Sequence, residues 1–319
     1  MRRNPEQFLE DTAGWYESCY LWSIVTMACY SRAVISARQH EQVLFYCQAV
    51  DCTSQLIGTR KSDEKIYKQM LALPNIGHTK RLPGWVMLHV GMRVRLTTTV
   101  LLPWAVQDSV GTVVEINLSG QDRQRLASSA DSHLDAEVLL QELPKGVYVK
   151  LDNCNHEFLP PRPCEQHRVE RGSCCDKCTA CRSFEGWVLV EPLVGQFTYT
   201  DPDAGFTLQV QRTQLPLMPA AACPLYALQG ATCDPGLIAH FVMPRRADDD
   251  IKWLIVYVML SRVRSLSRLR SLGLNSKIRD IIEGGPPAIV AENFEKLFRK
   301  KILDTHKAAV ASRSALGWQ

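Results

Sequence analysis

The segment from Leu254 to Leu272, LIVYVMLSRVRSLSRLRSL, limits the possible folds of this chain more than any other. Its first half is an apolar run that has to be buried, and its second half carries four arginines, with Arg262 at the junction. A buried strand or helix start that holds an arginine at a fixed point is a common device for binding phosphate, because the guanidinium stays charged and its donors form a fork. The segment makes Arg262 the first candidate functional residue, with a surface salt bridge as its alternative role.

The charge of the chain is concentrated near its C-terminal end. The sequence has 319 residues, of which 46% are hydrophobic and 22% charged, as in ordinary globular proteins with room for two domains. The net charge is only +4, but residues 251–319 hold 13 Lys and Arg against 5 Asp and Glu. A basic region beside a phosphate-reading arginine indicates a polyanionic partner, whereas a solvated helix face is the plainer explanation.

A second unusual segment, LYALQGAT, lies at Leu225 to Thr232. Its glycine lets the backbone approach a ligand closely, and the flanking amide and hydroxyl can bond phosphate or sugar oxygens. Taken together, QGAT at 229–232 and YVMLSR at 257–262 resemble motifs V and VI of superfamily 1 DNA helicases of the PIF/RecD-like branch. The segment QLPLMPA at 214–220 resembles the link in these helicases from an inserted barrel back to the RecA-like sheet.

The resemblance implies an α/β fold. It would be a discontinuous RecA-like domain of the P-loop NTPase type, with a parallel sheet and an inserted small β-barrel that carries a Cys-rich loop. Residues 1–81 and 214–275 would form the two segments of the RecA-like domain, and residues 82–213 the barrel, with the Cys-rich loop at 153–186. Residues 276–319 would form a C-terminal helical tail.

Hydrophobic periodicity and composition place the expected elements. They predict helices over 11–30, 61–73 and 288–311, strands over 31–36, 43–50, 147–152 and 237–243, and a polar surface loop over 119–135. The last helix would carry Val290, Phe294, Leu297, Phe298 and Ile302 on one face. We expect this face to pack on its own domain, with docking to a partner as the alternative.

The resemblance also implies roles for individual residues. Arg262 would be the catalytic arginine that the second RecA-like domain offers to ATP bound mainly on the first. Gly230 and Arg264 would lie near that cofactor, although a phosphate and a carboxylate are equally expected partners for Arg264. Gln229 and Thr232 would contact single-stranded DNA and couple it to the nucleotide cleft.

Several parts of a complete motor differ or are missing. Helicases of this branch have His or Asn, then Lys and Ser, just before the motif V glutamine, whereas this chain has Tyr226, Ala227 and Leu228. The sequence contains no GxxxxGK[ST] phosphate loop and no acidic pair after a buried strand. We therefore expect ATP and Mg²⁺ to bind only with the missing N-terminal RecA-like domain, in cis or in trans, and no ATP hydrolysis by this chain alone.

The Cys-rich loop is the one site whose chemistry could be complete. Six of the 12 cysteines lie between Cys154 and Cys181, and clustered cysteines in a reducing compartment favour metal over disulfides. Two pairs with knuckle spacing, Cys164 with His167 and Cys178 with Cys181, would supply four ligands to a structural zinc ion. Cys175 with Cys178 is an equally good second pair, Cys154 with His156 could replace one pair, and reduced thiols without metal are the alternative.

Two functions from different classes fit these observations. The first is the C-terminal part of an ATP-dependent DNA helicase, which binds single-stranded DNA. The alternative is a non-catalytic, zinc-bearing module that binds nucleic acid or protein. No secretory signal opens the chain and the apolar runs are too short to span a bilayer, so we expect an intracellular protein of the nucleus or cytoplasm.

Overall fold

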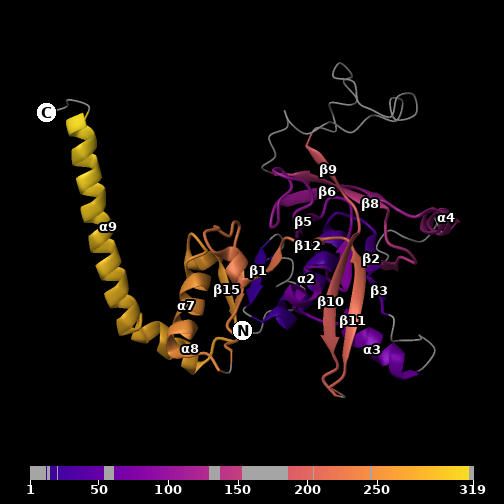
Figure 1. The fold of residues 1–319 in the computed structure, drawn as a ribbon, viewed down its shortest axis with the longest axis horizontal. Helices are drawn as coiled ribbons and strands as arrows, with labels where there is room; N and C mark the ends of the chain where they lie inside the picture. Colours follow the sequence, from indigo (N-terminus) through magenta and orange to yellow (C-terminus); the bar gives the residue numbers. More distant parts are fainter. Residues whose placement is uncertain are drawn as a thin grey trace.

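The computed structural model describes residues 12, 15–19, 21–53, 61–128, 137–152, 186–203, 205–244 and 246–315 (Figure 1). The helices are α2 (Trp22–Gln39), α3 (Lys61–Leu71), α4 (Gly120–Ser128), α7 (Asp249–Leu260), α8 (Ser276–Gly284) and α9 (Ala288–Ala315), with 3-10 turns η1 (Ile76–Thr79), η3 (Leu225–Leu228) and η4 (Leu266–Arg268). The strands are β1 (Tyr16–Cys19), β2 (Leu44–Gln48), β3 (Val50–Cys52), β4 (Trp85–Leu88), β5 (Arg93–Leu96), β6 (Val110–Asn117), β7 (Glu137–Leu139), β8 (Gly146–Leu151), β9 (Trp187–Val190), β10 (Leu193–Thr200), β11 (Thr207–Gln214), β12 (Leu217–Pro219), β13 (Ala222–Pro224), β14 (Leu237–His240) and β15 (Leu269–Leu272).

A four-stranded parallel sheet has the order β13-β1-β14-β15. The turn η3 follows β13, and α7 forms the crossover from β14 to its parallel neighbour β15. Helix α7 buries Ile255, Val256 and Met259 in the hydrophobic cluster that covers this sheet. Asp248 caps the helix by accepting a hydrogen bond from the backbone N–H of Ile251 at 2.9 Å. The expected mixed α/β fold with a parallel sheet is therefore confirmed.

Two expected elements before residue 40 are wrong in whole or in part. The helix predicted over 11–30 is wrong in its first half, where the chain forms strand β1, and right from Trp22 onward, where α2 begins; residues 31–36, predicted as a strand, lie inside α2. Small residues allow this helix to pack closely on β1 and β13, because Ala28, Cys29, Ala33 and Ala37 are buried along one face. The β-branched residues within 31–36 belong to the same helix. Packing of the helix on the sheet therefore overrides their strand propensity.

The remaining sheets are largely antiparallel. One has five strands in the order β12-β5-β6-β8-β9, one has the order β10-β11-β3, and a third combines β4, β2 and β7, of which only β2 and β7 run parallel. The strands β2 and β3 precede residue 82 but pair with strands from 82–213. The boundaries at 82 and 213, and the closure of these strands into a barrel, stay predictions.

A buried ion pair joins β3 and β11. Strand β11 alternates, and the register that buries Leu208 and Val210 also buries Arg212, which is 0% exposed. The guanidinium donates to both carboxylate oxygens of Asp51, at 2.7 and 2.6 Å, and to the carbonyl of Met70 at 2.9 Å. It also lies over the ring of Phe197, 5.1 Å from the centroid. This arginine ties α3 to the β10–β11 hairpin.

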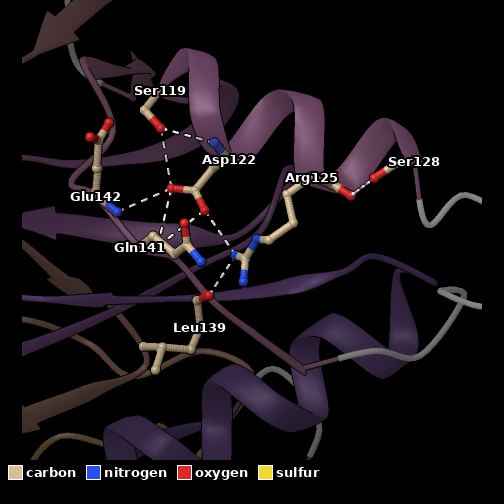
Figure 2. Close-up of polar contacts among 7 residues, drawn as sticks. All are labelled: Ser119, Asp122, Arg125, Ser128, Leu139, Gln141 and Glu142. Atoms are coloured by element: carbon tan, nitrogen blue, oxygen red, sulfur yellow. Dashed lines mark hydrogen bonds and ion pairs between the residues drawn. The ribbon is translucent and has the colours of Figure 1, made fainter.

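Helix α4 occupies part of the segment 119–135 that was predicted as a loop (Figure 2). Ser119 caps it by accepting from the backbone N–H of Asp122 at 3.1 Å. The Asp122 carboxylate is 0% exposed and accepts from the backbone N–H groups of Gln141 and Glu142 and from Arg125. Burial alone would raise the pKa of Asp122, but these donors hold it below its usual value.

The C-terminal helices contain the other departure from expectation. Helix α9 forms, but Figure 1 shows it as a long rod projecting away from the sheets. Phe294 is 68% exposed and Phe298 55% exposed, and Leu297 and Ile302 on the same face are also more than half exposed. The expectation that this face packs on its own domain is therefore wrong. The reason is geometric: Gly285 to Pro287 separates α9 from α8, and none of the described sheets lies beside it.

Candidate functional site

The QGAT segment forms an exposed turn between β13 and β14 of the parallel sheet. Strand β13 ends at Pro224, η3 follows, and the turn starts at Gln229. Gly230 has a φ of +79°, which only glycine adopts readily, so the glycine at this position is required by the turn itself. The side chains of Gln229 and Thr232 are exposed, and a ligand could reach them.

Arg262 lies next to this turn. It follows Ser261, the C-cap of α7. Its Nη1 donates to the carbonyl oxygens of Leu228 at 3.4 Å and Ala231 at 3.3 Å, and its backbone carbonyl accepts from the N–H of Cys233 at 2.8 Å. The two segments that resemble motifs V and VI are therefore in direct contact, although the arginine stands at the end of a helix and not of a strand.

The charge of Arg262 is not neutralised by an acidic side chain. Its Nε donates to the carbonyl of Val258 at 3.2 Å and its Nη2 to the hydroxyl of Ser261 at 2.8 Å. In the described part of the chain no carboxylate forms an ion pair with it. Burial raises the pKa of the neighbouring Cys233 thiol to about 12, so that thiol is neutral at pH 7. The half-buried guanidinium thus keeps a full positive charge that a phosphate could meet.

The other arginines of the segment differ from Arg262. Arg268 forms an ion pair with Asp234 at 2.5 Å, and Arg270 lies over the ring of Trp15, 5.0 Å from its centroid. Arg264 is exposed and makes no contact with another described side chain that would fix it. Among the described residues, Arg262, Arg264 and Arg270 form no ion pair with a carboxylate. Arg270 is held by the carbonyl oxygens of Ser267 and Leu269, whereas Arg262 is the one held by carbonyls of the QGAT turn and of η3.

The predicted zinc ligands cannot be placed. Cys164, His167, Cys178 and Cys181, and their alternatives, lie outside the described residues. Within the described ranges no group of three or more His, Cys, Asp and Glu side chains is arranged to hold a metal ion. Among the same residues, no helix is both long and apolar enough to cross a bilayer.

One aromatic side chain next to the turn was noted only as a departure from the helicase pattern. Tyr226, on η3, is 58% exposed, and its ring centroid lies 6.0 Å from that of Trp22 at the start of α2. The rings are inclined at 60° and form a corner. The sequence signal was the aromatic residue at a position where the resembling helicases have a polar one.

Comparisons with other proteins give a structural likeness only. No protein-family model matches the sequence, and no curated protein is similar to it. The Pif1 helicase from Candida albicans is 19% identical, with a TM-score of 0.44 over 92% of this chain and 55% of that one.

Two further crystal structures are similar over a comparable extent. Bacteroides Pif1 bound to single-stranded DNA is 15% identical, with a TM-score of 0.47 over 90% of this chain and 46% of that one. Bacteroides Pif1 in complex with ADP-AlF3 and single-stranded DNA is 16% identical, with a TM-score of 0.45 over 89% and 45%. The chain is thus structurally similar to part of the Pif1 helicases, and it spans about half the length of those it matches.

Proposed function

We propose that this chain is the distal half of an ATP-dependent DNA helicase motor. In this role it binds single-stranded DNA at the exposed Gln229 to Thr232 turn and presents Arg262 to ATP held by a separate RecA-like domain. Gly230 gives the turn its shape, and Arg264 adds positive charge beside the nucleotide. The bonds from Arg262 to the carbonyls of Leu228 and Ala231 carry the proposal.

These bonds connect the turn that would bind DNA with the arginine that would meet ATP. A motor has to couple these two binding events. A shift of the turn on binding DNA moves the carbonyl oxygens that hold the guanidinium, and a shift of the guanidinium towards phosphate releases those carbonyls. The distances of 3.3 and 3.4 Å are those of weak hydrogen bonds, which a charged phosphate oxygen can replace. Arg262 thus fits a position where its partner changes during a cycle.

The residues fit ATP only from one side. The guanidinium and the turn can stabilise charge that develops on the γ-phosphoryl group. Magnesium and the triphosphate would have to be held by the missing domain, because this sequence lacks the phosphate loop. That domain would supply the binding of the nucleotide, and this chain would supply the arginine.

The first test is made with the chain as it is. Fluorescence anisotropy with a labelled oligothymidine measures binding, and release of inorganic phosphate measures turnover. We expect binding that weakens steeply as salt rises, because cationic side chains release counterions from the DNA. We expect no ATP hydrolysis with or without the oligonucleotide. Binding that is absent even at low salt contradicts the proposal.

The second test concerns Arg262 in a complete motor. The chain is joined to an upstream domain that carries a phosphate loop, and ATP turnover is compared between the unchanged fusion, Arg262→Ala and Arg264→Ala. Loss of an arginine that stabilises phosphoryl transfer reduces turnover by roughly 10³-fold or more. Arg264→Ala is the comparison, and it should lose much less turnover, since Arg264 adds only charge beside the nucleotide and is not held by the turn. Equal losses in both variants contradict the assignment of Arg262.

A zinc-bearing binding module without a catalytic role is the second candidate. The absence of a phosphate loop and the replacement of the motif V Lys and Ser by Ala227 and Leu228 favour it. The metal content of the purified chain tests whether this module holds zinc. One zinc per chain, lost in Cys164→Ser and Cys178→Ser but kept in Cys47→Ser, supports the site, because Cys47 is buried in the core.

A further inference from the structure

A cleft of about 270 Å³ lies beside the candidate turn, between the start of α2, η3 and the loop that follows β5. Its walls include two aromatic rings, two arginines, a threonine and a carboxylate: Trp22, Tyr226, Arg81, Arg95, Thr97 and Asp108. The helicase roles proposed above use none of these side chains. Its volume suits one flat heterocycle and not a larger ligand.

The aromatic corner at the cleft presents an open ring face. The rings of Trp22 and Tyr226 are 6.0 Å apart and inclined at 60°, which leaves no room for a third ring between them. Tyr226 is nonetheless 58% exposed. A flat ligand can therefore stack on the outer face of Tyr226, with Trp22 closing one side.

A buried hydroxyl without a partner lies in the same cleft. Thr97 is 4% exposed, and its Oγ1 has no hydrogen-bond partner in the described structure. A buried polar group that stays unpaired costs roughly 1–3 kcal/mol, so such groups are uncommon in native structures. A ligand that offers a hydrogen-bonding edge at this depth would satisfy the hydroxyl.

The charges around the cleft favour an anionic backbone outside it. Arg81 is exposed and forms no ion pair with a described residue, whereas Arg95 is 8% exposed and donates to the carbonyl of Ala222 at 3.2 Å. The single nearby carboxylate, Asp108, lies 3.9 Å from the Nε of Arg95 and balances that charge. Arg81 lines the cleft and, among the described residues, has no acidic partner, so its charge is available to the phosphate of a stacked base.

We propose that this cleft binds one unpaired nucleobase of a single-stranded DNA, which stacks on Tyr226, bonds the Thr97 hydroxyl with its edge and places its phosphate at Arg81. The inference rests on the proposed function, because the strand is the one that the Gln229 to Thr232 turn would hold. Stacking replaces the contacts that a Lys and a Ser would make in the resembling helicases. A free nucleotide has the same chemistry, and the experiment separates it from a strand.

The experiment uses the full chain and an oligothymidine that carries one 2-aminopurine, whose emission falls when the base stacks. Anisotropy gives the affinity in the same samples. Tyr226→Ala removes the stacking face, and we expect binding to be weakened roughly 5- to 150-fold, with the emission change lost. Tyr226→Phe is the matched control, because it keeps the ring, and it should behave like the unchanged chain.

A second variant tests the buried hydroxyl. Thr97→Val keeps the shape of the side chain and removes an unsatisfied polar atom, so the free energy of unfolding should stay the same or rise. Binding of the strand should nevertheless weaken by roughly 2- to 10-fold, because a hydrogen bond to the base is lost. A residue with a purely structural role would not lower affinity while leaving stability intact.

The outcomes separate this inference from the proposed function. Strand binding that is equally tight in the unchanged chain and in Tyr226→Ala overturns the base cleft and leaves the helicase proposal standing. Absence of strand binding in the unchanged chain overturns both. If free 2-aminopurine deoxyriboside monophosphate binds as tightly as the oligonucleotide does, the ligand is a nucleotide and the strand assignment fails.

Discussion

Two arginines in different regions of the molecule show how one residue type serves two purposes. Arg212, in the antiparallel sheets, is completely buried and bonds both oxygens of Asp51. Arg262, beside the parallel sheet, is half buried and bonds only carbonyl and hydroxyl oxygens of the described chain. The first charge is neutralised permanently, whereas the second is held in position and left uncompensated. Placement without neutralisation is the property expected of a residue that meets a phosphate.

The largest effect should come from breaking the pair in the antiparallel region. Arg212→Ala leaves the Asp51 carboxylate buried and unpaired, which costs about 3–5 kcal/mol of unfolding free energy. Urea denaturation followed by circular dichroism measures it. Replacing both partners, as Arg212→Met with Asp51→Leu, should recover most of the loss. A small loss in Arg212→Ala would mean that the pair does not hold α3 to the hairpin.

The Asp122 carboxylate offers a second buried charge, in which the donors are mainly backbone N–H groups. Asp122→Asn should lower the free energy of unfolding by roughly 2–3 kcal/mol at pH 7. The pKa of Asp122 is lowered in the folded chain, so its contribution is complete above the unfolded pKa of about 4 and is lost as pH falls through the folded value. The difference between the variant and the unchanged chain should therefore shrink on acidification.

Asp249→Asn is the control for this pH dependence. Asp249 is 89% exposed and pairs only with Lys252 on the surface. Its removal should leave the unfolding free energy nearly unchanged, because an exposed ion pair is screened by water and salt. A difference between Asp122→Asn and the unchanged chain that grows as the pH falls would contradict the assigned direction of the pKa shift.

The next effect concerns the other arginine of the comparison. Arg262→Ala removes weak bonds to backbone carbonyl groups, and it should cost about 1 kcal/mol in unfolding free energy. Arg264→Ala, on the exposed surface, should stay within about 0.5 kcal/mol. If Arg262→Ala destabilises the chain as much as Arg212→Ala, then Arg262 is a structural residue, and the contrast between the two regions disappears.

The smallest stability effect should be in α9. Phe294→Ala should change the free energy of unfolding by less than about 0.5 kcal/mol, since the ring is 68% exposed. Phe197→Ala, which removes a ring that is 6% exposed and lies under Arg212, should cost about 3–5 kcal/mol. A large loss in Phe294→Ala would show that the apolar face of α9 is covered in solution.

Some of this structure could be predicted from sequence because local patterns determine it. The alternation over 147–152 and the apolar run over 43–50 predict strands that form, and the polar helix starting at Lys61 forms with nearly the expected length. Packing decided the elements that were wrong. The small residues of α2 select helix against β-branched neighbours, and the Ser119 cap starts a helix in a segment whose composition favours a loop.

The candidate site, too, could be predicted only in part from the sequence. The order of QGAT and YVMLSR predicted a functional pair; Arg262 does contact the turn, and the roles of these residues stay predictions. No local pattern could indicate that Arg212 pairs with Asp51, because the two residues lie 161 positions apart. Nor could a local pattern indicate the cleft at Tyr226, whose walls come from six separate segments. Long-range pairing of this kind is visible only in the fold.

The most direct measurement combines strand binding and ATP turnover in the chain as it is. The predicted result is oligothymidine binding whose affinity falls steeply with salt, no release of phosphate from ATP, and weaker binding in Tyr226→Ala. Hydrolysis of ATP by this chain alone would contradict the account, since it would require a phosphate loop that the sequence does not contain. Absence of strand binding at low salt would contradict it equally.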